Sequence, residues 1–65
     1  MQYSLHVHLR MGTRVQCIVH PFTADDDESA RKGAETRLSD VRNQYWDYPD
    51  AHPPSLYKGE QRIEW

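Results

Sequence analysis

The sequence predicts an α+β fold in which one amphipathic helix packs on one face of a single-layer antiparallel β-sheet. Apolar and polar residues alternate along residues 2–20, apolar residues recur every three or four positions within residues 24–46, and alternation returns in residues 60–65. A right-handed crossover from the second strand places the last strand beside the first, which gives a three-stranded sheet of order 2-1-3. A fourth strand is expected if Leu56 and Tyr57 pair across the following Lys-Gly turn. We expect a single domain over residues 1–65.

Residues 2–20 are predicted to form a hairpin that turns at Met11-Gly12-Thr13. Pairing about this turn places Arg10 opposite Arg14 and His8 opposite Gln16. One face then carries the side chains expected to meet the helix: Tyr3, Leu5, Val7, Leu9, Val15, Cys17 and Val19. The opposite, open face is expected to carry Ser4, His6, His8, Arg10, Arg14, Gln16, Ile18 and His20.

Proline and acidic residues predict where the hairpin ends and the helix begins. Pro21 is expected to end the second strand, because proline has no N–H to donate to the sheet. Thr23 is expected to cap the helix by accepting a hydrogen bond from the backbone N–H of Asp26. The helix is predicted over residues 24–46, and its apolar stripe consists of Ala30, Ala34, Leu38, Val41 and Tyr45.

Proline also predicts the end of the helix. Pro49 disfavours helical geometry at the residue before it, so we expect the helix to end near Trp46. Residues 47–55 are predicted to form an irregular connector because they are rich in proline, and residues 60–65 to form the last strand.

Composition limits the class of protein. The chain has 65 residues and one cysteine, Cys17, so no internal disulfide forms and a reducing compartment is expected. It shows no signal-peptide pattern, and no apolar run approaches the roughly 20 residues that span a bilayer. We therefore expect a cytoplasmic protein without a membrane role. Residues 1–20 contain two arginines and no acidic residue, whereas residues 21–65 contain ten acidic and six basic residues.

Catalytic and metal-binding motifs are weak. His6 and His8 resemble the paired histidines of rolling-circle nickases, with Tyr45 as the nucleophile, but Tyr45 belongs to the apolar stripe of the helix. His6, His8 and His20 are expected on one face, but a zinc site needs four ligands and no further ligand lies opposite them. We expect no metal, no cofactor, no small-molecule substrate and no enzymatic activity.

Carboxylates spread along the second half of the chain suggest a different function. Spaced carboxylates imitate the phosphates of DNA and occupy the lysine and arginine side chains of a protein that reads DNA. Trp46 and Tyr48 are expected to anchor such a contact if Trp46 is exposed rather than tucked under the Pro53-Pro54 connector. Several of these acids have a structural alternative, namely ion pairs along the helix or a role at its N-terminus. The predicted partner-binding residues are Asp25, Asp26, Asp27, Glu28, Glu35, Trp46, Asp47, Tyr48, Asp50, Glu60 and Glu64.

The acidic run 25–28, Trp46 and the terminal segment Arg62-Ile-Glu-Trp65, together with the predicted architecture, resemble small phage-encoded anti-CRISPR proteins directed at type I surveillance complexes. Several members of that group are DNA mimics that block recognition of the protospacer-adjacent motif. The resemblance implies a non-enzymatic inhibitor in the cytoplasm of a bacterial host. Its partner would be the DNA-recognising subunit of such a host ribonucleoprotein complex. Small phage inhibitors of host RNA polymerase have a similar strand–helix–strand plan.

Two alternatives use the open sheet face. A small nucleic-acid-binding module would bind phosphates with His6, His8, Arg10, Arg14 and His20. A homodimer would pair two open faces with Ile18 in the contact. We expect a monomer rather than a dimer.

Overall fold

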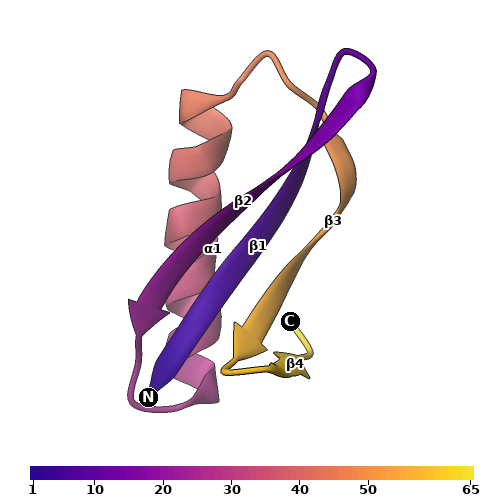
Figure 1. The fold of residues 1–65 in the computed structure, drawn as a ribbon. Coiled ribbons are helices and arrows are strands. Elements are labelled where there is room, and N and C mark those ends of the chain that lie inside the picture. Colours follow the sequence, from indigo (N-terminus) through magenta and orange to yellow (C-terminus); the bar gives the residue numbers. More distant parts are fainter.

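Four strands and one helix follow one another along the chain, and the computed structural model describes all of residues 1–65. The strands are β1 (Gln2–Met11), β2 (Arg14–Thr23), β3 (Asp50–Lys58) and β4 (Gln61–Ile63), and the helix α1 (Asp27–Gln44) connects β2 to β3. The strands form one antiparallel sheet in the order β2-β1-β3-β4, and α1 runs behind one face of it (Figure 1). The α+β prediction is confirmed, with the 2-1-3 order extended by a fourth strand at the edge.

The hairpin between β1 and β2 differs from the predicted one in its register. Arg10 pairs with Val15 rather than with Arg14, so the predicted register was wrong by one residue. The cause is the turn, which consists of Gly12 and Thr13 alone, with Gly12 at a φ of 66°. Two-residue turns with glycine in the first central position match the right-handed twist of the strands that they join.

This shift exchanges the two faces of β2. Val15, Cys17 and Val19 lie on the face away from the helix, where each valine is 49% exposed. Phe22, only 6% exposed, and the partly buried Ile18 pack toward the helix in their place. The other side chains on the helix side of β2 are Arg14, Gln16 and His20.

The junction of β2 and α1 also lies further along the chain than predicted. β2 continues through Pro21 to Thr23, because β2 is an edge strand and the proline nitrogen lies on its unpaired side. Thr23 is therefore a strand residue and does not cap the helix. Asp26 is the N-cap, and its side chain accepts a hydrogen bond of 2.8 Å from the backbone N–H of Ser29. The helix consequently begins at Asp27 rather than at residue 24.

The apolar stripe of α1 is confirmed: Ala30, Ala34 and Val41 are buried, and Leu38 and Tyr45 pack against the core from its margin. The helix ends at Gln44, two residues before the predicted end, and the backbone N–H of Tyr45 caps it by donating to the carbonyl of Val41.

Gly33 of α1 lies beside Phe22 of β2. A Cβ atom at this position would lie 3.4 Å from the ring of Phe22, an ordinary van der Waals distance, and 3.3 Å from Nη1 of Arg37. The guanidinium of Arg37 covers the same ring, 4.3 Å from its centroid, and donates a hydrogen bond of 3.1 Å to the Gly33 carbonyl. The ring of Phe22 and the guanidinium of Arg37 thus join β2 to α1.

The largest difference from the prediction concerns residues 47–55, because most of this expected connector belongs to β3. β3 pairs antiparallel with β1 along nearly its whole length, and Leu5 lies opposite the fully buried Leu56. The register shifts where Pro53 and Pro54 follow one another, and such a bulge accommodates residues that cannot donate to the sheet. The predicted last strand is reduced to β4, which pairs with β3 and not with β1.

The core lies between α1 and the face of the sheet that it covers. β1 contributes four of its nine buried residues, in agreement with the predicted alternation along this strand. The buried residues are Tyr3, Leu5, Val7, Leu9, Phe22, Ala30, Ala34, Val41 and Leu56.

Candidate functional site

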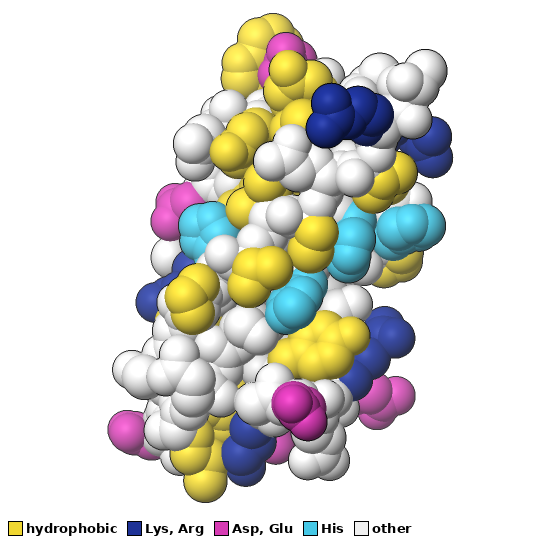
Figure 2. All heavy atoms as spheres, viewed as in Figure 1, with side chains coloured by type: hydrophobic (Ala, Val, Ile, Leu, Met, Phe, Trp, Pro, Cys, Tyr) yellow, Lys and Arg dark blue, Asp and Glu magenta, His cyan; other side chains and the backbone are white.

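The sheet face opposite α1 is not covered by any other part of the chain. Figure 2 shows this face, on which histidine side chains gather near the middle among apolar ones. The strand residues on this face include no acidic residue: Ser4, His6, His8, Arg10, Val15, Cys17, Val19, Pro21, His52, Ser55, Tyr57 and Arg62. We call this set the open sheet face.

The predicted open face was only partly right. His6, His8 and Arg10 lie on it, but Arg14, His20 and Ile18 lie on the helix side of the sheet because of the register shift. The predicted set therefore does not come together. The open sheet face instead includes the valines and the cysteine of β2, together with His52 and Ser55 of β3, which lie within the predicted connector.

The histidines of the open sheet face contact aromatic neighbours on β3. The ring of His6 lies 4.5 Å from the ring of Tyr57, and the ring of His8 lies 5.6 Å from that of His52. The Nε2 atom of His6 also lies 3.0 Å from the hydroxyl of Ser4. Burial, and secondarily the proximity of His8, lowers the pKa of His6 and so favours its neutral imidazole.

The structure brings together no group of three or more histidine, cysteine, aspartate or glutamate residues that could hold a metal ion. His20 lies on the other side of the sheet from His6 and His8, so the predicted common face of these three residues was wrong. The Nδ1 atom of His8 is buried and has no hydrogen-bond partner. Tyr45 packs against the core on the helix side, which separates it from the two histidines of the nickase comparison.

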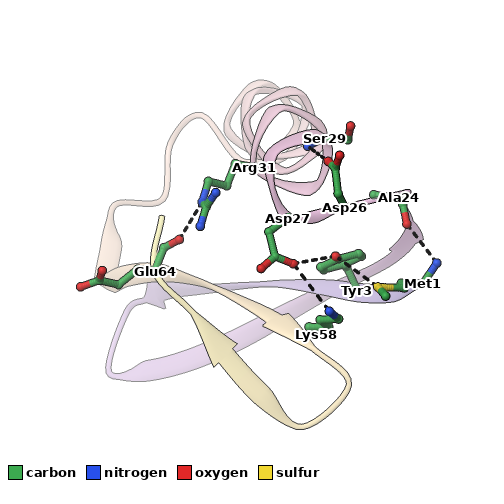
Figure 3. A network of polar contacts seen from close by, with 9 residues as sticks. All are labelled: Met1, Tyr3, Ala24, Asp26, Asp27, Ser29, Arg31, Lys58 and Glu64. Atoms are coloured by element: carbon green, nitrogen blue, oxygen red, sulfur yellow. Dashed lines mark hydrogen bonds and ion pairs between the residues drawn. The ribbon is translucent and has the colours of Figure 1, made fainter.

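Two carboxylates at the start of α1 serve the fold itself (Figure 3). The hydroxyl of Tyr3 donates a hydrogen bond of 2.8 Å to Oδ1 of Asp27, and Nζ of Lys58 lies 3.9 Å from the same oxygen. Burial of the phenol, followed by this bond to Asp27, raises the pKa of Tyr3 to about 12. Asp26 caps the helix, and its hydrogen bonds from Ser29 lower the pKa of the Asp26 carboxyl.

Two further acids of the predicted partner-binding set have internal partners. Asp50 accepts a hydrogen bond of 2.9 Å from Nη2 of Arg42, which joins the start of β3 to the end of α1. Glu28 lies 3.9 Å from Lys32, but both side chains are largely exposed and such a pair adds little stability.

The remaining acids of the set are exposed and make no ion pair or side-chain hydrogen bond: Asp25, Glu35, Asp47, Glu60 and Glu64. They do not form one patch. Asp25 precedes α1 and Asp47 follows it, and a helix of 18 residues separates the two by about 27 Å. Glu60 and Glu64 flank β4, where the backbone carbonyl of Glu64 accepts a hydrogen bond from Arg31 (Figure 3).

An exposed aromatic group lies where α1 leads into β3. Trp46 is 82% exposed and Tyr48 is 40% exposed, and the ring of Tyr48 lies 6.3 Å from that of Tyr45. Of the two expectations for Trp46, the structure confirms exposure, since the indole does not tuck under the prolines of β3. A shallow depression runs beside these rings and reaches the ion pair of Arg42 and Asp50. We call Tyr45, Trp46, Asp47 and Tyr48 the aromatic corner.

Comparison of the chain with protein-family models, with curated proteins and with solved structures finds no match. The fold therefore defines the class of the protein as a small α+β protein with one sheet and one helix. The helix α1, with 18 residues, is not long and apolar enough to cross a membrane.

Proposed function

We propose that this protein is a non-enzymatic inhibitor that binds a cationic, DNA-reading surface of a host complex, with the aromatic corner as its anchor. The main observation that supports this proposal is the exposure of Trp46. An indole that is 82% exposed leaves a large apolar surface in water, and tryptophan is the residue type most enriched at the energetic centres of protein interfaces.

Fewer acidic side chains are free to bind a partner than the sequence suggests. Asp26, Asp27 and Asp50 have internal partners, so they offer less charge to a partner protein than free carboxylates do. Asp47 adjoins Trp46 in the chain and makes no ion pair. In our proposal Asp47 contacts an arginine or lysine of the partner while the indole of Trp46 fills an apolar pocket beside it.

The target that we propose is the DNA-recognising subunit of a type I CRISPR surveillance complex, in the cytoplasm of a bacterial host. The mechanism is competition, since cationic side chains that hold Asp47 and its neighbours cannot hold the phosphates of the protospacer-adjacent duplex. Free carboxylates at separate places, such as Glu35 and Glu60, add a general attraction that salt weakens.

The test is a gel-shift competition with a purified type I surveillance complex and a duplex that carries its protospacer-adjacent motif. The wild-type protein is expected to release the duplex. Trp46→Ala is expected to weaken this inhibition by about 30-fold, because truncating a residue at the energetic centre of an interface costs about 2 kcal/mol of binding free energy. Asp47→Lys is expected to weaken it as well, and more strongly at low salt.

Trp65→Ala is the matched control, because Trp65 is an exposed tryptophan at the far end of the chain beyond β4. Equal loss in the Trp46 and Trp65 variants, or no loss in either, would contradict the role of the aromatic corner. The same variants assayed in transcription by host RNA polymerase test the alternative target.

A second candidate function, nucleic-acid binding, is favoured by the absence of acidic strand residues on the open sheet face. Arg10 and Arg62 supply positive charge there, and Tyr57 offers an aromatic ring on which a base could stack. Retention of a single-stranded oligonucleotide, lost in Arg10→Glu but kept in Arg14→Glu on the opposite side of the sheet, would establish this function. No retention by the wild-type protein would eliminate it.

A further inference from the structure

The outer edge of β2 is an unpaired row of backbone donors and acceptors. On the other side of β1, the N–H of Arg10 donates to the carbonyl of Pro49 at 2.9 Å, and the carbonyl of Gln2 accepts from Gly59 at 3.2 Å. Even-numbered residues of β1 therefore hydrogen-bond toward β3. Because bonding direction alternates in antiparallel strands, the odd-numbered residues bond to β2.

This alternation fixes which groups of β2 remain free. The odd-numbered residues of β1 pair with the even-numbered residues 16–22 of β2, and this pairing has no register shift. Val15, Cys17 and Val19 therefore direct their N–H and C=O groups away from the sheet. Pro21 follows in the same row, with a carbonyl but no N–H.

The two edges of the sheet differ in protection. At one edge, β4 has three residues, which is too short to template a long pairing. The part of β3 that β4 does not cover is interrupted by Pro53 and Pro54, which cannot donate to a partner strand. β2, at the other, has ten residues and carries no charged side chain between Arg14 and His20. A long, uncharged edge strand is an open site for strand addition. Its only interruptions are the turn at one end and Pro21 at the other.

The sequence of β2 fits an antiparallel copy of itself. When Cys17 of one copy faces Cys17 of the other, Val15 faces Val19, and all three free N–H groups of each strand find a carbonyl. Sliding the copies by two residues would set Pro21 against Val15, and that pair would form one hydrogen bond instead of two. In the register centred on Cys17, each of the three pairs forms two hydrogen bonds.

The side chains agree with this register. The two Val15–Val19 pairs lie on either side of the Cys17 pair on the open sheet face, where β-branched residues pack well across strands. On the helix side Gln16 faces Ile18, and Arg14 faces His20, so no two acidic or two always-charged basic residues oppose each other. A two-fold axis at Cys17, perpendicular to the sheet, keeps the two helices on the same side of the joined sheet.

We propose that two copies of this chain form a dimer by antiparallel pairing of β2 with β2, with Cys17 at the two-fold axis. The result is one continuous sheet of eight strands with both helices on one side. This dimer differs from the face-to-face pairing suggested by the sequence, because Ile18 lies on the helix side and packs against the core. It does not depend on the proposed inhibitory function.

The first test measures the molar mass of the full chain over a range of concentrations by analytical ultracentrifugation. The wild-type protein is expected to shift from one chain to two. Val15→Lys/Val19→Lys is expected to weaken the dimer by at least about tenfold, because it sets lysines opposite one another across the axis. Both valines are half exposed, so the monomer should keep its circular dichroism.

A charge-complementary pair makes this test specific. Val15→Glu/Val19→Glu alone should also be monomeric, whereas an equimolar mixture with the lysine variant should restore the dimer as a mixed species. The matched control is Thr36→Lys/Ser39→Lys, which adds the same charge at exposed positions of α1 and should leave the dimer intact. A wild-type chain that stays monomeric at every concentration, or a dimer that survives in the lysine variant, would overturn the proposal.

Cys17 supplies an independent readout. Facing residues in antiparallel strands lie within the Cα separation that a disulfide bridges, so a mild thiol oxidant should join the two copies in high yield. The comparison is Cys17→Ser/Ser39→Cys, which carries one exposed cysteine on α1. Equal rates of cross-linking in the two proteins would show random collision and contradict the register.

Discussion

The register of the hairpin can be tested by truncating Phe22 and Val19, because the two possible registers assign opposite roles to these residues. In the structure the ring of Phe22 is buried, stacks on Tyr3 at 5.9 Å and is covered by Arg37. Val19 is half exposed on the open sheet face. In the register that pairs Arg10 with Arg14, Val19 would be a core residue and Phe22 would lie beyond the strand.

The magnitudes follow from burial. Truncating a buried phenylalanine to alanine costs about 3–5 kcal/mol, and we expect about 3 kcal/mol for Phe22→Ala because this ring lies at the margin of the core. Val19→Ala removes two half-exposed methyl groups and should cost less than about 1 kcal/mol. A chain of this length has a total stability of roughly 3–10 kcal/mol, so Phe22→Ala approaches complete unfolding.

The assay is urea unfolding followed by circular dichroism, in dilute protein so that association does not add to stability. Phe22→Leu, with an expected cost of about 1–1.5 kcal/mol, keeps the measurement quantitative if the alanine variant does not fold. A larger loss of stability for Val19→Ala than for Phe22→Leu would refute the register and the assignment of faces that depends on it.

Three further variants test other contacts. Burial and the hydrogen bond to Asp27 raise the pKa of Tyr3 from an ordinary 10.0 to about 12. The contribution of the Tyr3 hydroxyl to stability is therefore full below pH 10 and is lost as the pH rises through about 12. Unfolding curves of Tyr3→Phe should lack this alkaline loss. Hydrogen bonds from Ser29 lower the pKa of Asp26, so the stability from this cap is full above pH 3.8 and is lost at lower pH. Asp26→Asn should keep the cap, and its melting temperature should depend less on pH in that range. An unchanged acid profile of this variant would exclude the linkage. Leu56→Ala should cost about 2–5 kcal/mol in urea unfolding if β3 forms part of the core, whereas a loss below about 1 kcal/mol would return this segment to a connector.

Periodicity was sufficient to predict β1 and α1, and insufficient for β2. The alternation of Leu5, Val7 and Leu9 has only one apolar phase, so β1 has one possible buried face. β2 has two phases, because Val15 and Val19 fall on one side and Ile18 and Phe22 on the other. The choice between them depends on whether the turn has two or three residues, which is decided by the backbone of Gly12 rather than by hydropathy.

Only the end of strand β3 was predicted, because local rules for proline favoured a connector over residues 47–55. The expected pairing of Leu56 and Tyr57 across the Lys58-Gly59 turn is confirmed. Pro53 and Pro54 do interrupt the pairing, but the interruption is a bulge, and the strand resumes with the same partner. Burial of Leu56 against β1 and α1 outweighs the local preference. His52 and Tyr57 lie on the open sheet face because they belong to β3, so their positions on this face were not predicted either.

The candidate site was predicted only in part for a similar reason. The exposure of Trp46 depends on how the chain leaves α1, and the sequence allowed two outcomes. The internal use of Asp27 depends on Tyr3 and Lys58, which are distant from it in the sequence and meet it only when β1, β3 and α1 assemble. Spacing along a helix detects the pair of Glu28 and Lys32 but not such long-range partners.

The central position of β1 has a consequence for the route by which the chain folds. Its contact with β2 closes through a two-residue turn, whereas its contact with β3 joins Tyr3 to Lys58 across nearly the whole sequence. Hairpins close within microseconds, but distant strands must first overcome the entropy of a long loop. During synthesis, β1 therefore leaves the ribosome long before its second neighbour exists. One edge of the strand that supplies four of the nine core residues stays unpaired until β3 emerges.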